Sequence, residues 1–439
     1  MKKVLIIANL FHASPRIPGI AKYLKDFGWE PTILTVPIKE DPRNLLIFPT
    51  GFRDERKVRI IEAPYQGDIF WFWRKIFKFM NFKTDKSILN QVKERSGVVS
   101  QKSFIDYIFV FYNAIFAYPD TEKKWRNPAI KIGNSLLDEE KFDAIISSSS
   151  PVTAHIIANN LKKKYKLPWL ADLRDLWTQN HNYPYPWLRR VFEEKLELKT
   201  LLPADALITV SQPLAEKLKK LHKKPNVYTI TNGFFEEEIN RGVSLTKKFT
   251  IIYAGSVYAG KQDPKDLFIA VKELISEKII NPDDIKIKFY TGKIPWLEKE
   301  IVDFGLENLA KTYDKISRSE IMKIQSESQI LLLMDWKDKE EKGWISLKIF
   351  GYLASLRPIL AVGGAGGNII EKTLSETNSG YYASTVGQIK KFLNNSYLEY
   401  KKTGKVGYKG DLNKIKQHSY KEKSREFAAL LNEFTKGQE

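Results

Sequence analysis

The chain has 439 residues, about three times the ~150 residues of a typical single domain, which favours two domains with separate cores. Hydrophobic residues make up 43% and charged residues 28%, and these proportions exclude intrinsic disorder, collagen-like sequence and a disulfide-stapled mini-protein. Lysine and arginine number 71 against 52 acidic residues, so the net charge of +19 predicts an anionic partner: nucleic acid, an anionic membrane or a phosphorylated substrate.

Residue usage narrows the chemistry further. Cysteine is absent, which excludes disulfides and thiolate chemistry and is typical of a cytoplasmic protein. The five histidines show no H-x-x-x-H spacing, so we expect no metal site and no cofactor. The apolar run at 4–8 stops at Asn9 with no cleavage site after it, which favours a buried strand over a signal peptide. No run reaches the ~18–20 apolar residues of a membrane span, so any membrane contact is expected to be peripheral.

The first part of the chain is predicted as a series of βα units. Its helices are expected at 20–27 and 152–165, and its strands at 3–8, 31–36, 142–146, 169–171, 206–210 and 228–230. Strands that alternate with helices predict a parallel sheet covered on both faces. The polar passage at 236–248 is typical of an interdomain linker.

A second series of the same kind follows. Strands are expected at 249–254, 285–290, 330–334 and 358–362, with helices around 267–274 and 348–356 and an amphipathic helix at 420–434. The prediction is therefore an α/β protein with two doubly wound, Rossmann-like domains that face each other across a cleft. We expect the first domain at 1–240 with an insertion around 65–120, the second at 248–410, and a C-terminal helical segment at 411–439 that packs back on the domains.

Ligands of such sheets bind at the carboxyl ends of the strands. Gly255 and Ser256 come directly after a predicted strand and are followed by Lys261, a cation that can neutralise a diphosphate. In a chain with 71 basic residues, a lysine near a loop also arises by chance. A second loop carries Gly363, Gly364, Gly366 and Gly367, which indicates either close backbone approach to a ligand or a flexible hinge.

Three charged residues follow the strand at 169–171 in the first domain. Asp172 or Asp175 can orient or deprotonate an acceptor hydroxyl, with Arg174 beside them. The alternative is a salt bridge between these neighbouring acids and Arg174, with no catalytic role.

Aromatic and basic residues alternate at 69–83. This pattern predicts an anionic membrane surface as a partner, with the contacts made by Trp71, Trp73, Arg74, Lys75 and Lys78. The alternative is that the aromatic residues form the core of an insertion. A nucleic-acid-binding protein is disfavoured, because no helix-turn-helix, zinc finger or ribonucleoprotein signature occurs and the basic residues are scattered.

Taken in order, the motifs resemble those of GT-B glycosyltransferases of family four. The matching segments are FDAIISSSS at 142–150, PWLADLRDLW at 168–177, ADALITVS at 204–211, TNGF at 231–234 and the stretch at 348–360. The resemblance implies a retaining enzyme that moves a sugar from a nucleotide-sugar donor to a glycan or lipid-linked acceptor in surface polysaccharide assembly. The nucleotide sugar is then a substrate, and the expected location is the cytoplasmic face of the cell membrane.

The resemblance also implies roles for individual residues. It implies a donor site at Gly255, Ser256, Lys261, Lys348, Gly363, Gly364, Gly366 and Gly367, an acceptor site at Pro18, Gly19, Arg174 and Asn232, and catalytic roles for Asp172, Asp175 and Lys261. No Asp-x-Asp triplet occurs, so charge neutralisation by lysine and backbone amides is expected in place of a metal ion.

The chain departs from the family at three positions. The first basic residue of the family's donor pair is Ser256 here, and the paired glutamates fall on Gly343 and Gly351. Glu340 and Glu341 can substitute for them if their loop folds back, although such a run of charges is more typical of a solvated loop. The departures leave open a second possibility, a GT-B pseudo-enzyme that binds or scaffolds without transferring a sugar.

Overall fold

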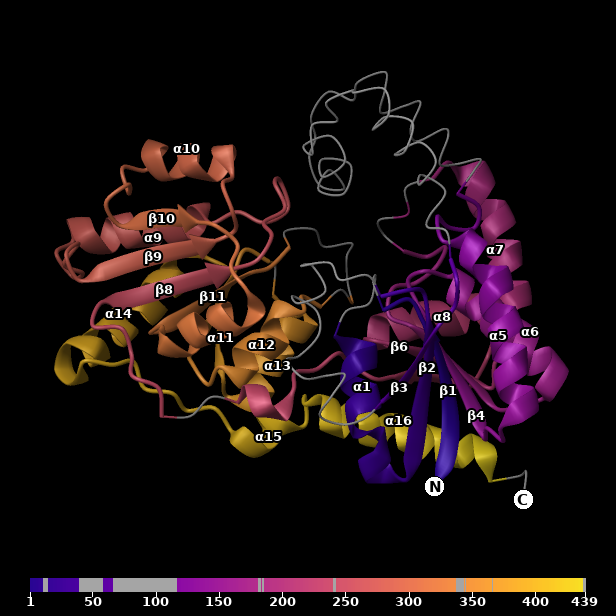
Figure 1. The fold of residues 1–439 in the computed structure, drawn as a ribbon. Helices are drawn as coiled ribbons and strands as arrows, with labels where there is room; N and C mark the ends of the chain where they lie inside the picture. The colour runs from indigo at the N-terminus through magenta and orange to yellow at the C-terminus, as the bar shows by residue number, and fades with distance from the viewer. Residues whose placement is uncertain are drawn as a thin grey trace, which may run out of the picture. The chain divides into compact units, whose positions relative to one another are not determined.

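The structure is a computed structural model, and it describes residues 1–10, 15–38, 58–65, 117–180, 183, 185–239, 242–336, 343, 345–364 and 366–436. The chain divides into two compact units, of which the first joins Met1–Thr231 to Tyr420–Glu439 and the second is Asn232–Ser419. Each unit is built on one parallel sheet with helices on both faces (Figure 1).

The first unit has a seven-stranded sheet in the order β3-β2-β1-β4-β5-β6-β7 within the described residues. The strands are β1 Lys2–Ala8, β2 Trp29–Thr35, β3 Arg59–Glu62, β4 Ala144–Ser149, β5 Trp169–Leu173, β6 Ala206–Thr209 and β7 Val227–Thr229. The helices are α1 Arg16–Leu24, α5 Arg126–Glu139, α6 Thr153–Tyr165, α7 Trp187–Leu201, α8 Gln212–His222 and α16 Tyr420–Thr435, with 3₁₀ turns at Lys25–Phe27 and Lys123–Trp125.

Side chains of β1 alternate between the two faces of this sheet, as a strand requires. Val4 and Ile6 pack on one face with apolar residues of α1 and α16, whereas Leu5 and Ile7 pack on the other with residues of α5, α6, α7 and α8. Because both faces are covered, the sequence of β1 is a continuous apolar run in which polar and apolar residues do not alternate.

The second unit has a six-stranded sheet in the order β10-β9-β8-β11-β12-β13 within the described residues. The strands are β8 Phe249–Ala254, β9 Ile285–Tyr290, β10 Ala310–Tyr313, β11 Ile330–Met334, β12 Ile359–Val362 and β13 Gly380–Ala383. The helices are α9 Lys265–Ser276, α10 Pro295–Asp303, α11 Arg318–Glu327, α12 Lys348–Ala354, α13 Ile369–Thr377, α14 Val386–Thr403 and α15 Leu412–Lys416, with a 3₁₀ turn at Glu236–Glu238.

The two faces of the second sheet are also both buried. Residues of α9, α10 and α14 cover one face, and residues of α12, α13 and α15 cover the other. The predicted α/β class with two doubly wound sheets is therefore confirmed.

The boundary between the units differs from the predicted one. The chain passes into the second unit after Thr231, so the polar passage at 236–248 belongs to that unit. Phe234 and Phe235 explain the difference, since both are fully buried and Phe234 lies in the apolar core with α12 and α15. Of the predicted C-terminal segment, α15 stays with the second unit, and the chain returns to the first at Tyr420.

The C-terminal helix α16 packs against α1 in the first unit (Figure 1). A Cβ atom on Gly19 would lie 2.4 Å from a ring carbon of Tyr420, so only glycine lets the two helices approach this closely. The Ser424 hydroxyl donates to the carbonyl of Ile20 at 2.9 Å. Pro18 and Gly19, for which the resemblance implied an acceptor site, lie inside α1 and are buried, and the small size of Gly19 serves helix packing.

Candidate donor and acceptor sites

The strand order of the second unit reverses between β8 and β11, which are neighbours in the sheet. In doubly wound sheets the ligand crevice opens at the carboxyl ends of the strands at such a reversal. Here those ends are Ala254 on β8 and Met334 on β11. The loops that follow these two strands are therefore where a ligand of this unit is expected.

Lys348, the first residue of α12, reaches back to the loop after β8. Its Nζ donates to the carbonyl oxygen of Ser256 at 3.3 Å and lies 5.2 Å from the ring centre of Tyr253. Gly255 has φ +111°, and a Cβ atom there would lie 2.6 Å from Lys348 Cε. Both the backbone and the space require glycine. The structure thus brings together the predicted donor residues Gly255, Ser256 and Lys348.

The charge of Lys348 is uncompensated by the described residues. Burial and the positive charge of Lys315 lower the pKa of Lys348 to about 8. In the described part of the chain, no carboxylate lies within ion-pair distance of Lys348 Nζ. Below pH 8 this half-buried ammonium is a cation, and a bound anion would supply the missing counter-charge.

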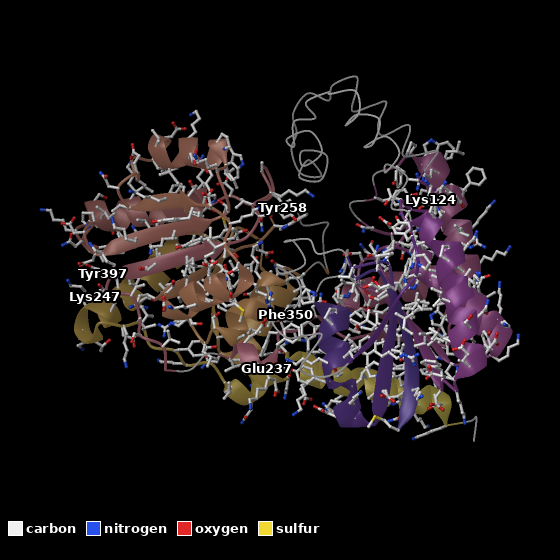
Figure 2. The ribbon with its side chains drawn as sticks, in the orientation of Figure 1. Lys124, Glu237, Lys247, Tyr258, Phe350 and Tyr397 are labelled. Atoms are coloured by element: carbon white, nitrogen blue, oxygen red, sulfur yellow. The ribbon has the colours of Figure 1, made fainter. Side chains whose placement is uncertain are left out.

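Lys261 lies near the end of β11. Its Nζ is 4.1 Å from the ring centre of Trp336, which follows the strand. Tyr258, which is labelled in Figure 2, packs on the same indole with ring centres 5.4 Å apart. Stacking over an indole fixes the position of the Lys261 cation beside the end of β11.

Gln262 fixes this loop to the sheet, a role that the sequence reasoning missed. It is fully buried, its Nε2 donates to the carbonyl of Met334 at 2.6 Å, and its Oε1 accepts from the backbone N–H of Tyr258 at 3.3 Å. The only sequence signal was a neutral amide beside Lys261, which composition alone does not distinguish from a surface residue.

The glycine-rich loop after β12 is packed against a buried carboxylate. Asp335 accepts hydrogen bonds from Tyr382 Oη at 2.6 Å and from the side-chain amide of Asn368. A Cβ atom on Gly364 would lie 2.0 Å from Tyr382 Oη and one on Gly363 would lie 3.2 Å from the Asp335 carbonyl oxygen. Internal packing therefore accounts for these two glycines.

The other two predicted glycines of this loop lie closer to α13. Gly366 and Gly367 have φ of +76° and +68°, and the backbone N–H of Gly367 donates to Glu371. A Cβ atom on Gly367 would have no neighbour within 4 Å, so packing does not require glycine there, whereas the positive φ favours it.

In the first unit the strand order reverses between β1 and β4. A small hollow lies at the carboxyl ends of these strands. It is lined by Ala8, Asn9, Arg16, Ile17, Ser148, Ser149, Ser150 and Arg174. Polar groups from three strand ends and the start of α1 thus meet where the first unit is expected to hold a ligand.

Asp172, predicted as an acceptor base, lies on β5 and is fully buried. Its carboxylate accepts from Arg16 Nη2 at 2.8 Å and Nε at 3.0 Å, and from Ser148 Oγ at 2.7 Å. Because both oxygens are occupied and shielded from solvent, Asp172 is not placed to take a proton from an acceptor. It positions Arg16, which also donates to the carbonyl of Thr231 at 2.7 Å.

Arg174 and Asp175 form the neighbouring ion pair that was the alternative prediction, with Arg174 Nη2 at 3.2 Å from an Asp175 oxygen. Arg174 lines the hollow, and Asp175 is half-exposed. Asn232, also predicted for the acceptor, is buried and is the first residue of the second unit. Sequence reasoning missed Arg16 and Ser148, since their partner Asp172 is 156 residues from Arg16.

Comparisons with known proteins identify the fold. Residues 106–237 match the family model described as Glycosyltransferase Family 4. A glycosyltransferase from Rickettsia africae ESF-5 is 13% identical with a TM-score of 0.57, and the alignment covers 100% of this chain and 99% of that one. HepE from Anabaena, solved with UDP and glucose, is 10% identical with a TM-score of 0.60 over 99% and 100%. The chain is a GT-B protein similar to family four.

A third GT-B structure agrees with these two. A TarM variant from S. aureus is 11% identical with a TM-score of 0.55, covering 98% of this chain and 100% of that one. No curated protein matches the sequence. The family resemblance inferred from the motifs is thus confirmed, and the comparisons support a glycosyltransferase.

The family resemblance predicts paired glutamates at two positions that are glycines in this chain, Gly343 and Gly351. Gly351 lies one turn after Lys348 on α12, and a Cβ atom there would meet nothing within 4 Å. Gly343 is buried with φ +104°, a conformation that a glutamate adopts only with strain. Glu340 and Glu341 lie outside the described residues.

The predicted membrane contacts, Trp71, Trp73, Arg74, Lys75 and Lys78, also lie outside the described residues. Among the residues that the structure does describe, no helix is long and apolar enough to cross a membrane. The same residues hold no group of three or more histidine and acidic side chains arranged around a possible metal ion.

Proposed function

We propose that the protein is a glycosyltransferase that moves a sugar from a nucleotide-sugar donor to a glycan or lipid-linked acceptor. The observation that carries the proposal is Lys348, a half-buried cation at the reversal point of the second sheet with no described carboxylate as its partner. A donor diphosphate has the charge and the size to complete this site.

The transfer breaks the bond between the sugar and the diphosphate, and negative charge develops on the leaving nucleoside diphosphate. Lys261 lies in the loop after β8, and Lys348 begins α12 after the loop that follows β11, so both can stabilise that charge. This electrostatic role is the basis for proposing metal-independent catalysis. Retention of anomeric configuration rests on the family resemblance alone.

The acceptor hydroxyl must lose its proton as the new glycosidic bond forms. With Asp172 buried against Arg16, the remaining predicted carboxylate is Asp175, which is half-exposed beside Arg174. We assign the proton acceptor to Asp175 and the orientation of the acceptor to the hollow that Arg174 and Ser149 line.

The donor and the location follow from different observations. HepE was solved with UDP-glucose, so UDP-glucose is the first donor to test. The net charge of +19 supports an acceptor held at the anionic cytoplasmic face of the membrane, as in the assembly of a surface polysaccharide.

Calorimetric titration with UDP and UDP-glucose, followed by an assay for UDP release, tests the proposal. Lys348→Met should weaken UDP binding about a hundredfold, because the cation is lost while the side-chain length is kept. Lys261→Ala should weaken it about tenfold. The matched control is Lys265→Met, an exposed lysine at the start of α9. Absence of binding by every nucleotide and nucleotide sugar would refute the proposal.

A second candidate function, a GT-B pseudo-enzyme, is favoured by Gly343 and Gly351 at the glutamate positions. A pseudo-enzyme would bind UDP through Lys348 and release none from any nucleotide sugar. Binding with turnover supports the transferase, and binding without turnover across UDP-, GDP- and other nucleotide sugars supports the pseudo-enzyme.

A further inference from the structure

In helix α7 of the first unit, several charged residues face the protein interior and several apolar residues face solvent, the reverse of an ordinary surface helix. Arg189, Glu193 and Glu197 are buried. Their charges are satisfied inside: Arg189 Nη2 pairs with Glu193 at 2.6 Å, and Glu197 accepts from the backbone of Thr178 at 3.0 Å and lies 3.2 Å from His222 Nε2.

The outer side of the same helix is apolar. Trp187 is 75% exposed and Phe192 is 55% exposed, with Leu188 and Val191 exposed between them. With 3.6 residues per turn these four share one side of α7, and Leu202 at its C-terminal end continues that side. We call this surface, Trp187, Leu188, Val191, Phe192 and Leu202, the α7 apolar face.

Basic residues accompany this face. Arg190, Lys195 and Lys199 are exposed on α7, whereas the acids of the helix are buried, apart from the half-buried Glu194. An exposed helix side that combines apolar, aromatic and basic residues is complementary to an anionic lipid surface, where rings enter the headgroup region and lysines meet phosphate.

A short described segment, residues 117–119, lies against the same helix. Residues 117–119 follow directly on the segment at 66–116, and they contact α7: Arg189 Nη2 donates to the carbonyls of Ala117 and Pro119 at 2.6 and 3.1 Å. Tyr118 Oη donates to the carbonyl of Phe192 at 3.4 Å. Residues 117–119 thus pack on α7 and reach the backbone of Phe192 on the α7 apolar face.

From these observations we infer that the α7 apolar face is a docking surface for an anionic phospholipid bilayer. The occupant is a lipid surface rather than a second copy of the chain, because the exposed charges of α7 are of one sign and would repel in a symmetric contact. The inference deepens the proposed function, since it rests on the proposal that the acceptor is membrane-held, but its test needs no nucleotide and no turnover.

The experiment uses the absence of cysteine in the chain. Val191→Cys carries an environment-sensitive dye on the α7 apolar face, and Val302→Cys carries the same dye at an equally exposed apolar position on α10. With vesicles of phosphatidylcholine and phosphatidylglycerol, the dye at 191 should brighten and shift to the blue, and the dye at 302 should not. Vesicles of phosphatidylcholine alone should give a weaker response, and added salt should reduce it.

Unlabelled variants separate this surface from the alternatives in a vesicle flotation assay. Trp187→Ser with Phe192→Ser should lower the bound fraction about tenfold, and Lys195→Glu with Lys199→Glu should lower it further on anionic vesicles. Val302→Ser with Leu398→Ser, also exposed apolar residues, is the control and should bind like the unmodified chain. UDP binding should stay unchanged in all of them, so a failure of the proposed function would be seen separately.

Three results would overturn the inference. One is a chain that does not bind anionic vesicles. Another is an α7 variant that binds as well as the unmodified chain while substitutions at Trp71 and Trp73 abolish binding. The third is a chain that sediments as a dimer and that Trp187→Ser with Phe192→Ser converts to a monomer, since that would assign the face to a second copy.

Discussion

Each unit has a parallel sheet whose strand order reverses at one point, and the charged residues at that point differ between the two units. In the first unit Arg16 pairs with Asp172 and Arg174 pairs with Asp175, so the charges there are neutralised within the protein. In the second unit Lys348 has no such partner among the described residues. For the proposed transferase, this difference assigns the anionic donor to the second unit and a hydroxyl-bearing acceptor to the first.

The largest effect is expected when Asp172, the carboxylate that neutralises Arg16, is removed. Asp172→Asn should lower the free energy of unfolding by about 3–5 kcal/mol, because Arg16 is left as an unpaired buried charge. Urea denaturation measures the effect. Asp175→Asn is the control, since its half-exposed pair with Arg174 should contribute less than about 1 kcal/mol. Equal losses in the two variants would show that the first ion pair is not a buried structural element.

The next prediction concerns a substitution at Gly255 that displaces the Lys348 side chain while leaving the lysine itself in place. Gly255→Ala should destabilise the fold by about 1–2 kcal/mol and weaken UDP binding about tenfold, because the new methyl group displaces Lys348 Cε. Gly260→Ala shares the left-handed backbone, with φ +75°, but has open space around it. It should lose stability to a similar extent and keep its affinity. A loss of affinity in both variants would point to the loop backbone and not to Lys348.

A third prediction concerns pH. Lys348 has its pKa lowered to about 8, so it is charged below pH 8 and neutral above it. UDP affinity should therefore fall about tenfold between pH 7 and pH 9, a range in which the phosphates of UDP are already ionised. Calorimetry at stepped pH measures the fall. Lys348→Arg keeps its charge throughout and should show a flat profile, and the same decline in that variant would assign the titration to another group.

The smallest effect is expected at the glutamate positions. Gly351→Ala should raise the free energy of unfolding by about 0.5–1 kcal/mol, because alanine favours the helix and space is open there. Gly343→Ala should lower it, since φ is +104°. Thermal unfolding of the two variants gives the comparison. Destabilisation by Gly351→Ala would mean that a neighbour fills the space beside Lys348.

The central strands and the edge strand β7 could be predicted from the sequence, and the other three edge strands could not. The runs at 249–254, 285–290 and 330–334 are β8, β9 and β11 as the structure has them. The three strands that were missed, β3, β10 and β13, all lie at sheet edges. Each is short and partly exposed, so it has no continuous apolar run to reveal it.

Some residues of the candidate sites could also be predicted from the sequence, and others could not. Gly255 and Lys348 were found because a glycine after a strand and a basic residue in a family motif leave local signals. Arg16 and the inward orientation of Asp172 were missed because pairing between residues 156 apart leaves no local pattern. The helix predicted to begin at residue 20 begins at Arg16, and the packing of Gly19 on Tyr420, at the far end of the chain, likewise leaves no local pattern.

That distant partner affects the order in which the protein folds during synthesis. The apolar surface of α1 stays uncovered until α16 has left the ribosome, and α16 is made after the entire second unit. The second unit, continuous in sequence, can fold while the first is still waiting for its last helix. Nascent chains halted before residue 420 should therefore carry a folded second unit and an exposed apolar strip on the first, which is a natural target for a chaperone.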